Sequence, residues 1–261
     1  MISIRNIDFS KSQRQLTEKV CLKPSDFGFA DLSASTSPVS ICIVDTGCPL
    51  HSGLKFNDSV LKNVYVDFYG TESIPWDENG HATAISGVIA GKTDRYSGLC
   101  PGAFLRYARC IGIDGRTNVK KIAAGMLWGA AAGSDVILVA AGTESRDRYL
   151  EEITNKCVQK GSIVVAAGKS NDKSDAKKVF PGMLPRVYSA CFGKSNIVVH
   201  REDGGVDVQL GHRGCWTFSP DDRYIKLGGS SIAAAILAGI ISSYIASGKN
   251  KDDIKEIMRN T

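Results

Sequence analysis

Short apolar runs rich in β-branched residues alternate along the chain with amphipathic segments of helical length. The apolar runs, which predict buried strands, cover residues 40–44, 104–111, 135–142 and 162–168. The segments of helical spacing cover residues 81–91, 119–133 and 146–161. Strands that alternate with helices in this way form parallel crossovers. The alternation therefore predicts an α/β fold in three layers (αβα), with a mainly parallel sheet between two layers of helices.

The sequence departs from this alternation towards both ends. Residues 187–227 have the pattern of short strands and turns, and a last helix is expected from residue 231. The first residues are polar and only weakly periodic, and the stretch SASTSP at 33–38 is typical of a linker. We therefore expect an N-terminal arm or linker over residues 1–38 and one domain over residues 39–261.

Charge and composition narrow the classes of partner. The 261 residues are 43% hydrophobic and 23% charged, which is typical of a soluble globular protein able to bury a core. The net charge of +5 comes from lysines and arginines that are scattered among acidic residues. Nucleic acid is therefore not an expected partner.

Neither a secretory signal nor a membrane span is predicted. Residues 1–20 lack the apolar core of a signal, and the one candidate span, 232–246, is shorter than the ~20 residues that a span needs. We therefore expect a buried helix at 232–246, no membrane partner and a cytoplasmic location. The eight cysteines occur singly, without a C-x-x-C pair, so most should be buried thiols rather than zinc ligands.

Three residue types needed for nucleophilic catalysis fall at the ends of predicted elements. A serine nucleophile needs a histidine base, and that imidazole needs a buried acid to orient it. Asp45 follows a predicted strand, His81 begins a predicted helix, and Ser231 begins the last helix. On spacing alone, such residues are more often structural: Asp45 would be a turn residue, His81 a helix-start residue, and Ser230 or Ser231 an N-cap.

Six segments, in order, resemble the motifs of subtilisin-like serine proteases. They are VDTGCPLHSGL (44–54), NGHATAISGVIAG (79–91), GLCPGAFLRYARCIGIDGRT (98–117), GSDVILVAAG (133–142), GSIVVAAGKSND with VFPGMLPRVYSACFG (161–172 and 179–193), and GGSSIAAAILAG (228–239). The resemblance spans about residues 39–245. It implies the subtilisin-like α/β fold and a serine endopeptidase that acts on a peptide or protein substrate.

The resemblance also implies a role for each matched residue. Asp45 becomes the orienting acid, His81 the general base and later acid, and Ser231 the nucleophile, with its backbone N–H as one oxyanion donor. The residues that it assigns to the substrate groove are Ala140, Ala141, Gly142, Ala167, Gly168 and Val179. Val179 predicts a shallow primary pocket that favours a small side chain. No cofactor or metal is implied here, because no acidic cluster marks a calcium site and Cys48 and His51 lack a second ligand pair.

Lys169 is the main departure from the family pattern. The family has an asparagine at this position, and its side-chain amide is the second oxyanion donor. In subtilisin, the loss of this donor costs about 10² to 10³ in turnover. Lys169 could therefore replace the donor, leave a slow enzyme, or mark a site that has lost catalysis.

Two further classes of function stay open beside the endopeptidase. A pseudoprotease would keep the groove and act as a binding or scaffold protein. Alternatively, a peptide-processing or macrocyclising protease of a biosynthetic pathway would let an amine intercept the acyl-enzyme. Since little sequence surrounds the matched segments, the catalytic unit is expected to be minimal and to have a regulatory protein partner.

Overall fold

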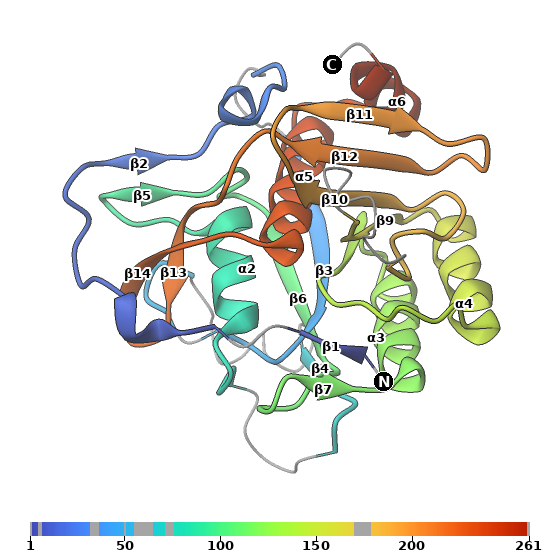
Figure 1. The fold of residues 1–261 in the computed structure, drawn as a ribbon, viewed down its shortest axis with the longest axis horizontal. Helices are drawn as coiled ribbons and strands as arrows, with labels where there is room; N and C mark the ends of the chain where they lie inside the picture. Colours follow the sequence, from blue (N-terminus) through green and yellow to red (C-terminus); the bar gives the residue numbers. More distant parts are fainter. Residues whose placement is uncertain are drawn as a thin grey trace.

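A parallel sheet runs through the centre of the molecule, in the strand order β11-β12-β10-β9-β8-β3-β6-β4 (Figure 1). The computed structural model describes residues 2–4, 7–31, 37–49, 51–54, 65–70, 76–169 and 179–259. The strands of this sheet are β3 (Ser40–Asp45), β4 (Tyr65–Asp67), β6 (Phe104–Arg109), β8 (Val136–Val139), β9 (Ile163–Ala167), β10 (Tyr188–Phe192), β11 (Ile197–His200) and β12 (Val206–Leu210). Neighbouring strands are parallel except at the edge, where β11 runs antiparallel to β12.

Helices cover both faces of this sheet, which confirms the predicted three layers. One face carries α2 (His81–Ala90) and α5 (Ser230–Ala246), and the other carries α3 (Val119–Ala131) and α4 (Arg148–Gln159) (Figure 1). Successive side chains of a strand point to opposite faces. In β3, Ile41 and Ile43 therefore join the core beneath α2 and α5, while Cys42 and Val44 join the core beneath α3 and α4.

Glycines set the distance between α3 and the sheet. A Cβ added at Gly129 would lie 2.6 Å from the Cβ of Cys42, and one added at Gly125 would lie 2.5 Å from the sulfur of Cys110. Real Cβ atoms do not approach other heavy atoms so closely. The two glycines thus let the helix backbone lie directly on buried cysteines, and seven of the eight cysteines are buried, as the sequence predicts for most of them.

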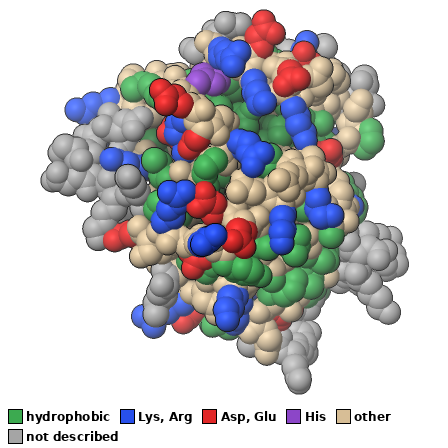
Figure 2. All heavy atoms as spheres, turned by 90° about the vertical axis from the view of Figure 1, so that its right-hand side faces the viewer, with side chains coloured by type: hydrophobic (Ala, Val, Ile, Leu, Met, Phe, Trp, Pro, Cys, Tyr) green, Lys and Arg blue, Asp and Glu red, His purple; other side chains and the backbone are tan. Residues whose placement is uncertain are grey.

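Helix α4 differs from α3 in having one clearly buried face and one solvent-exposed face. Its buried residues, Leu150, Ile153, Thr154 and Cys157, are spaced as one face of a helix. Acidic and basic side chains are interspersed over the surface on this side of the molecule (Figure 2). The exposed pair Arg148 and Glu152, 3.5 Å apart, is an example.

α5 is buried on almost every side. Its residues from Ile232 to Ile241 are all within the core, and short side chains such as Ala234 and Gly239 allow it to pack between α2 and the sheet. This confirms the buried helix expected at 232–246. Among the described residues, no helix is both long and apolar enough to cross a bilayer.

Smaller elements complete the fold around this sheet. They are the hairpin of β13 (Cys215–Ser219) and β14 (Arg223–Leu227), the C-terminal helix α6 (Lys251–Arg259), and the short helices η1 (Phe9–Lys11) and η2 (Pro24–Phe27). Two short pairings also occur: β1 (Ile2–Ser3) with β7 (Arg116–Thr117), and β2 (Val20–Cys21) with β5 (Tyr96–Ser97).

Much of the N-terminal segment lies against the domain. Leu16, Phe27 and Phe29 are buried in the same core as α2 and α5, and the hydroxyl of Tyr244 donates to the carbonyl of Ala30 at 3.0 Å. Residues 32–36, which include most of the predicted linker, lie outside the described residues. The division of the chain at residue 38 stays a prediction.

We expect Leu237→Ala in α5 to lower the free energy of unfolding by about 2–5 kcal/mol, because it leaves a cavity in a fully buried part of the core. Urea denaturation followed by circular dichroism measures the change. Ile197→Ala on edge strand β11, where the side chain is 38% exposed, is the matched control and should cost far less. Equal losses in the two variants would contradict the assignment of α5 to the core.

Candidate active site

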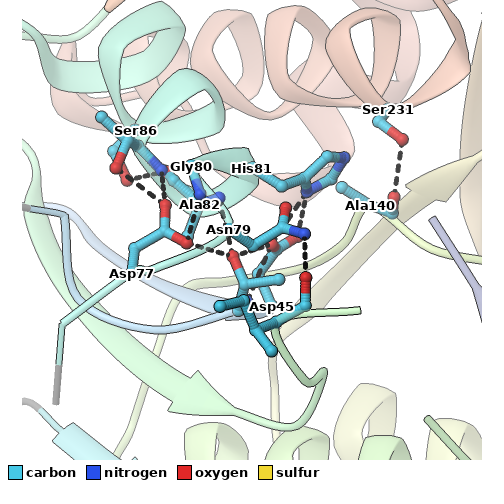
Figure 3. Close-up of polar contacts among 12 residues, drawn as sticks. Asp45, Asp77, Asn79, Gly80, His81, Ala82, Ser86, Ala140 and Ser231 are labelled. Carbon is cyan, nitrogen blue, oxygen red and sulfur yellow. Dashed lines mark hydrogen bonds and ion pairs between the residues drawn. The ribbon is translucent and has the colours of Figure 1, made fainter. Parts of the chain in front are cut away.

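Asp45 and His81 meet at the carboxyl edge of the sheet. Asp45 is the last residue of β3 and His81 the first residue of α2, and the two side chains are buried. The Nδ1 atom of His81 lies 2.8 Å from one carboxylate oxygen of Asp45 and 2.9 Å from the other (Figure 3). The backbone N–H of Thr46 also donates to Asp45, at 2.8 Å. The strand end and the helix start thus bring together an acid and an imidazole that lie 36 residues apart in sequence.

A second buried carboxylate, Asp77, holds this pair in place. One of its oxygens accepts from the hydroxyl of Thr46 at 2.6 Å and from the N–H of Gly80 at 2.9 Å. The other accepts from the N–H and hydroxyl of Thr83, both at 2.7 Å. The Thr46 hydroxyl also lies 3.0 Å from Asp45, so it connects the two carboxylates. Asp77 therefore ties the first turn of α2 to the loop that follows β3.

Sequence reasoning did not identify Asp77. Its one signal is an acidic residue shortly before the predicted helix at 81–91, and such residues usually cap helices. Here Asp77 satisfies N–H groups at the start of α2 in that way. Only the fold reveals that Asp77 also bonds to Thr46, the residue that follows Asp45.

Burial and nearby charges shift the pKa values of His81 and Asp77. Burial lowers the pKa of the His81 imidazole, but the charge and hydrogen bond of Asp45, with a smaller effect of Asp77, outweigh it, so the pKa is raised. Burial likewise raises the pKa of Asp77, although its hydrogen bonds from Thr46 and Thr83 oppose the shift. A carboxylate on Nδ1 holds the proton there, which leaves Nε2 of His81 as the nitrogen able to accept a proton.

Ser231 lies at the start of α5, beside the same cavity as His81. Its hydroxyl donates to the backbone carbonyl of Ala140 at 2.7 Å, and Figure 3 shows the side chain turned toward that carbonyl. Ser230 precedes it as the first residue of the helix. The structure therefore brings His81 and Ser231 to one cavity, with Asp45 bonded to His81 behind it and the serine hydroxyl bonded to the backbone of the groove wall.

The N-terminus of α5 gives this side of the cavity a positive character. The first N–H groups of a helix have no partner within the helix, and the helix dipole adds partial positive charge there. Gly229, before the helix, has φ = 106°, and no side chain caps the helix. The N–H of Ser231 thus belongs to a helix end that can stabilise negative charge on an oxygen atom.

The cavity, of about 1260 Å³, is lined by most of the predicted groove residues, namely Ala140, Ala141, Gly142, Ala167 and Val179. A side chain at position 142 would collide with Val179, so this part of the wall requires a glycine. Gly168 is buried and Lys169 is half-buried, and neither is among the described residues that line the cavity. Lys169 thus follows the lining residue Ala167 by two positions without itself being among the described lining residues.

His51 has a structural environment. Its ring stacks on Phe218 with centroids 3.7 Å apart, Nδ1 accepts from the N–H of Gly53 at 3.0 Å, and Nε2 donates to the carbonyl of Arg223 at 3.3 Å. Both ring nitrogens are therefore used by the protein. In the described ranges, no three His, Cys, Asp or Glu side chains are placed to hold a metal ion.

We expect Asp45→Asn to lower the pKa of His81, because it removes the charge that raises this pKa and leaves the opposing effect of burial. Titration of the four histidines by NMR measures the change. Asp252→Asn, at a carboxyl that is 94% exposed on α6, is the matched control and should leave the His81 pKa unchanged. An unaltered His81 pKa in Asp45→Asn would contradict the assigned pairing.

Two proteinases are among the known proteins with sequences similar to this chain. Thermitase of Thermoactinomyces vulgaris is 27% identical over 241 residues, which cover 87% of this chain and 82% of thermitase. The thermophilic serine proteinase of Bacillus sp. (strain AK1) is 25% identical over 244 residues, 88% of this chain, but the match spans only 58% of that protein.

A similar fold is known from the crystal structure of a cold adapted subtilisin-like serine proteinase. The TM-score is 0.65 at 20% identity, and the match covers 85% of this chain and 80% of that chain. The sequence model of the subtilase family, peptidase family S8, matches residues 36–261. Since this match includes most of the chain together with Asp45, His81 and Ser231, the protein belongs to the subtilase family.

Proposed function

We propose that the chain is a serine endopeptidase that hydrolyses peptide bonds through an acyl-enzyme on Ser231. The observation that carries the proposal is the buried hydrogen bond between Asp45 and His81 beside a cavity that also holds Ser231. Subtilase membership supports a serine peptidase. The endopeptidase activity and the role of each residue are the proposal.

The reaction begins when the Ser231 hydroxyl leaves the Ala140 carbonyl and turns toward Nε2 of His81. The serine oxygen then bonds to the peptide carbonyl carbon, while His81 takes the serine proton and Asp45 stabilises the resulting imidazolium. Negative charge develops on the carbonyl oxygen, which faces the N–H of Ser231. His81 passes the proton to the leaving amine as the C–N bond breaks, and water hydrolyses the acyl-enzyme by the same steps.

The cavity at the carboxyl edge of the sheet, where the scissile peptide would lie, suits a substrate with a small side chain. Val179 lines the cavity beside Gly142, and its branched side chain fills space there. We therefore keep the prediction of a shallow primary pocket that favours a small side chain. The cytoplasmic location and a regulatory protein partner also stay predictions.

A binding or scaffold protein is the second candidate, and two observations favour it. The Ser231 hydroxyl is bonded to backbone, and the described cavity lining does not include Lys169, at the position where the family has its second oxyanion donor. Both features fit a groove that binds peptide without efficient turnover. A peptide-processing or macrocyclising protease is a variant of the first candidate, in which an amine replaces water.

A fluorophosphonate probe tests the first candidate directly. We expect the wild-type chain to be labelled, because the probe reacts with an activated serine, and Ser231→Ala to lose the label entirely. Ser230→Ala is the matched control on the neighbouring residue and should retain labelling. Labelling that is lost with Ser230→Ala but kept with Ser231→Ala would contradict the assigned nucleophile.

Lys169→Asn tests whether the lysine weakens the site. A lysine has a longer stem and a strongly hydrated ammonium, so an asparagine amide should be the better donor to an oxyanion. We expect turnover of a peptide substrate to rise by up to about 10²-fold, in line with the value of this donor in subtilisin. Lys160→Asn at the end of α4 is a remote control. Unchanged or reduced turnover in Lys169→Asn would contradict the idea that Lys169 weakens the site.

A further inference from the structure

The guanidinium of Arg201, which directly follows β11, gathers three backbone carbonyls around one nitrogen. Its side chain is only 13% exposed. Nη2 donates to the carbonyls of Gly182 at 3.2 Å, Leu184 at 2.9 Å and Val187 at 3.0 Å. An amino group of arginine has two hydrogens, so the three carbonyls must share them. The attraction of a positive charge for carbonyl dipoles therefore holds the segment 181–187, which leads into β10.

Two carboxylates fix the guanidinium from the other side. Oδ2 of Asp203 lies 3.6 Å from Nη1, and Oδ1 of Asp207 lies 3.5 Å from Nε. The same oxygen of Asp207 accepts from the hydroxyl of Ser189 at 2.6 Å. A side chain at Gly205 would collide with the guanidinium, so this position requires a glycine. We call these two carboxylates and the three carbonyls the guanidinium cage.

The segment held by the cage lies directly behind the cavity of the candidate active site. A Cβ added at Gly182 would lie 2.5 Å from the carbonyl oxygen of Ala167, a residue that lines the cavity. Phe180 and Thr143 exchange two backbone hydrogen bonds, of 2.8 and 3.0 Å, and both Thr143 and Val179 line the cavity. A displacement of the segment would therefore be passed to the wall beside Val179.

We propose that Arg201 is a positioning residue, a fixed internal cation that holds the segment 181–187 and thereby keeps the primary pocket beside Val179 shallow and selective for a small side chain. The selectivity rests on the proposed function. Arg201 is not among the described residues that line the cavity, so it acts through the segment and not on the substrate. Without its charge, carbonyls and carboxylates would face one another with no counter-ion, and the segment should loosen.

Hydrogen exchange measures how firmly the segment is held. We expect the amides of Met183 and Leu184, which donate within the segment, to exchange at least about 10-fold faster in Arg201→Ala. Free guanidinium, at a concentration too low to denature the protein, should fill the vacated cage and restore slow exchange. Urea has nearly the same shape but no charge, and it should not restore it. Unchanged exchange in Arg201→Ala, or equal restoration by urea, would overturn the inference.

Two peptide substrates that differ only in alanine or phenylalanine before the scissile bond test the pocket. We expect the ratio of kcat/KM for the alanine substrate to that for the phenylalanine substrate to fall at least about 5-fold in Arg201→Ala, because a loosened wall admits the larger side chain. Free guanidinium should raise the ratio again. A loss of folded protein would lower both values alike and leave the ratio as it was. An unchanged ratio would therefore overturn the role of Arg201 in selectivity.

Three further variants separate charge from volume and from position. Arg186→Ala removes an arginine of the same segment that bonds to Asn155 outside the cage, at 2.8 Å, and it should leave both measurements unchanged. Arg201→Lys keeps the charge and should stay within about 3-fold of the wild type. Arg201→Gln removes the charge with less loss of volume and should behave as Arg201→Ala, which keeps the test available if the alanine variant does not fold. Equal results for Arg201→Lys and Arg201→Gln would contradict the role of charge.

The two measurements also separate this inference from the proposed function. If the wild type cleaves neither substrate while exchange responds to Arg201→Ala and to guanidinium as expected, the cage stands and the peptidase proposal fails. If the wild type cleaves the alanine substrate but Arg201→Ala alters neither exchange nor the ratio, the inference fails and the peptidase proposal stands.

Discussion

The buried hydrogen bond between Asp45 and His81 is the interaction on which the rest of the site depends. A carboxylate removed from water is costly unless donors surround it. Asp45 meets this requirement with the Thr46 backbone and the His81 imidazole, and Asp77 extends the network into α2. The network joins the end of one strand, the loop before α2 and the first turn of that helix. Its geometry is therefore set by the packing of the whole layer and not by one loop.

The layered fold could be predicted from the sequence because its signals are local. Runs such as 41–44 and 163–167 are buried on both faces, so they are apolar throughout and bounded by polar or glycine residues. The edge strands of the sheet were harder to predict from the sequence. Strand β4 is short, and β11 carries exposed residues, so neither has the pattern of a buried strand.

The site was predictable only in part, because only its local signals can be recognised in the sequence. Family motifs located Asp45, His81 and Ser231, and the fold brings His81 and Ser231 to one cavity with Asp45 bonded to His81. The motifs did not reveal that Ala140 accepts the serine hydroxyl, that Asp77 links to Thr46, or that Ser3 pairs with Gly142. Each of these contacts joins residues distant in sequence through backbone atoms or a short polar side chain, so neither periodicity nor composition indicates it.

The burial of α5 on almost every side has a consequence for how this protein can change over time. A helix whose neighbours are all filled tolerates few substitutions, since a larger side chain overpacks and a smaller one leaves a void. The serine at its start is therefore attached to the part of the molecule least free to vary. Exposed residues that line the cavity, such as Glu144 and Lys226, lie where changes in side chain are better accommodated. New peptide preferences should thus evolve at such positions, while the chemistry beneath them remains constant.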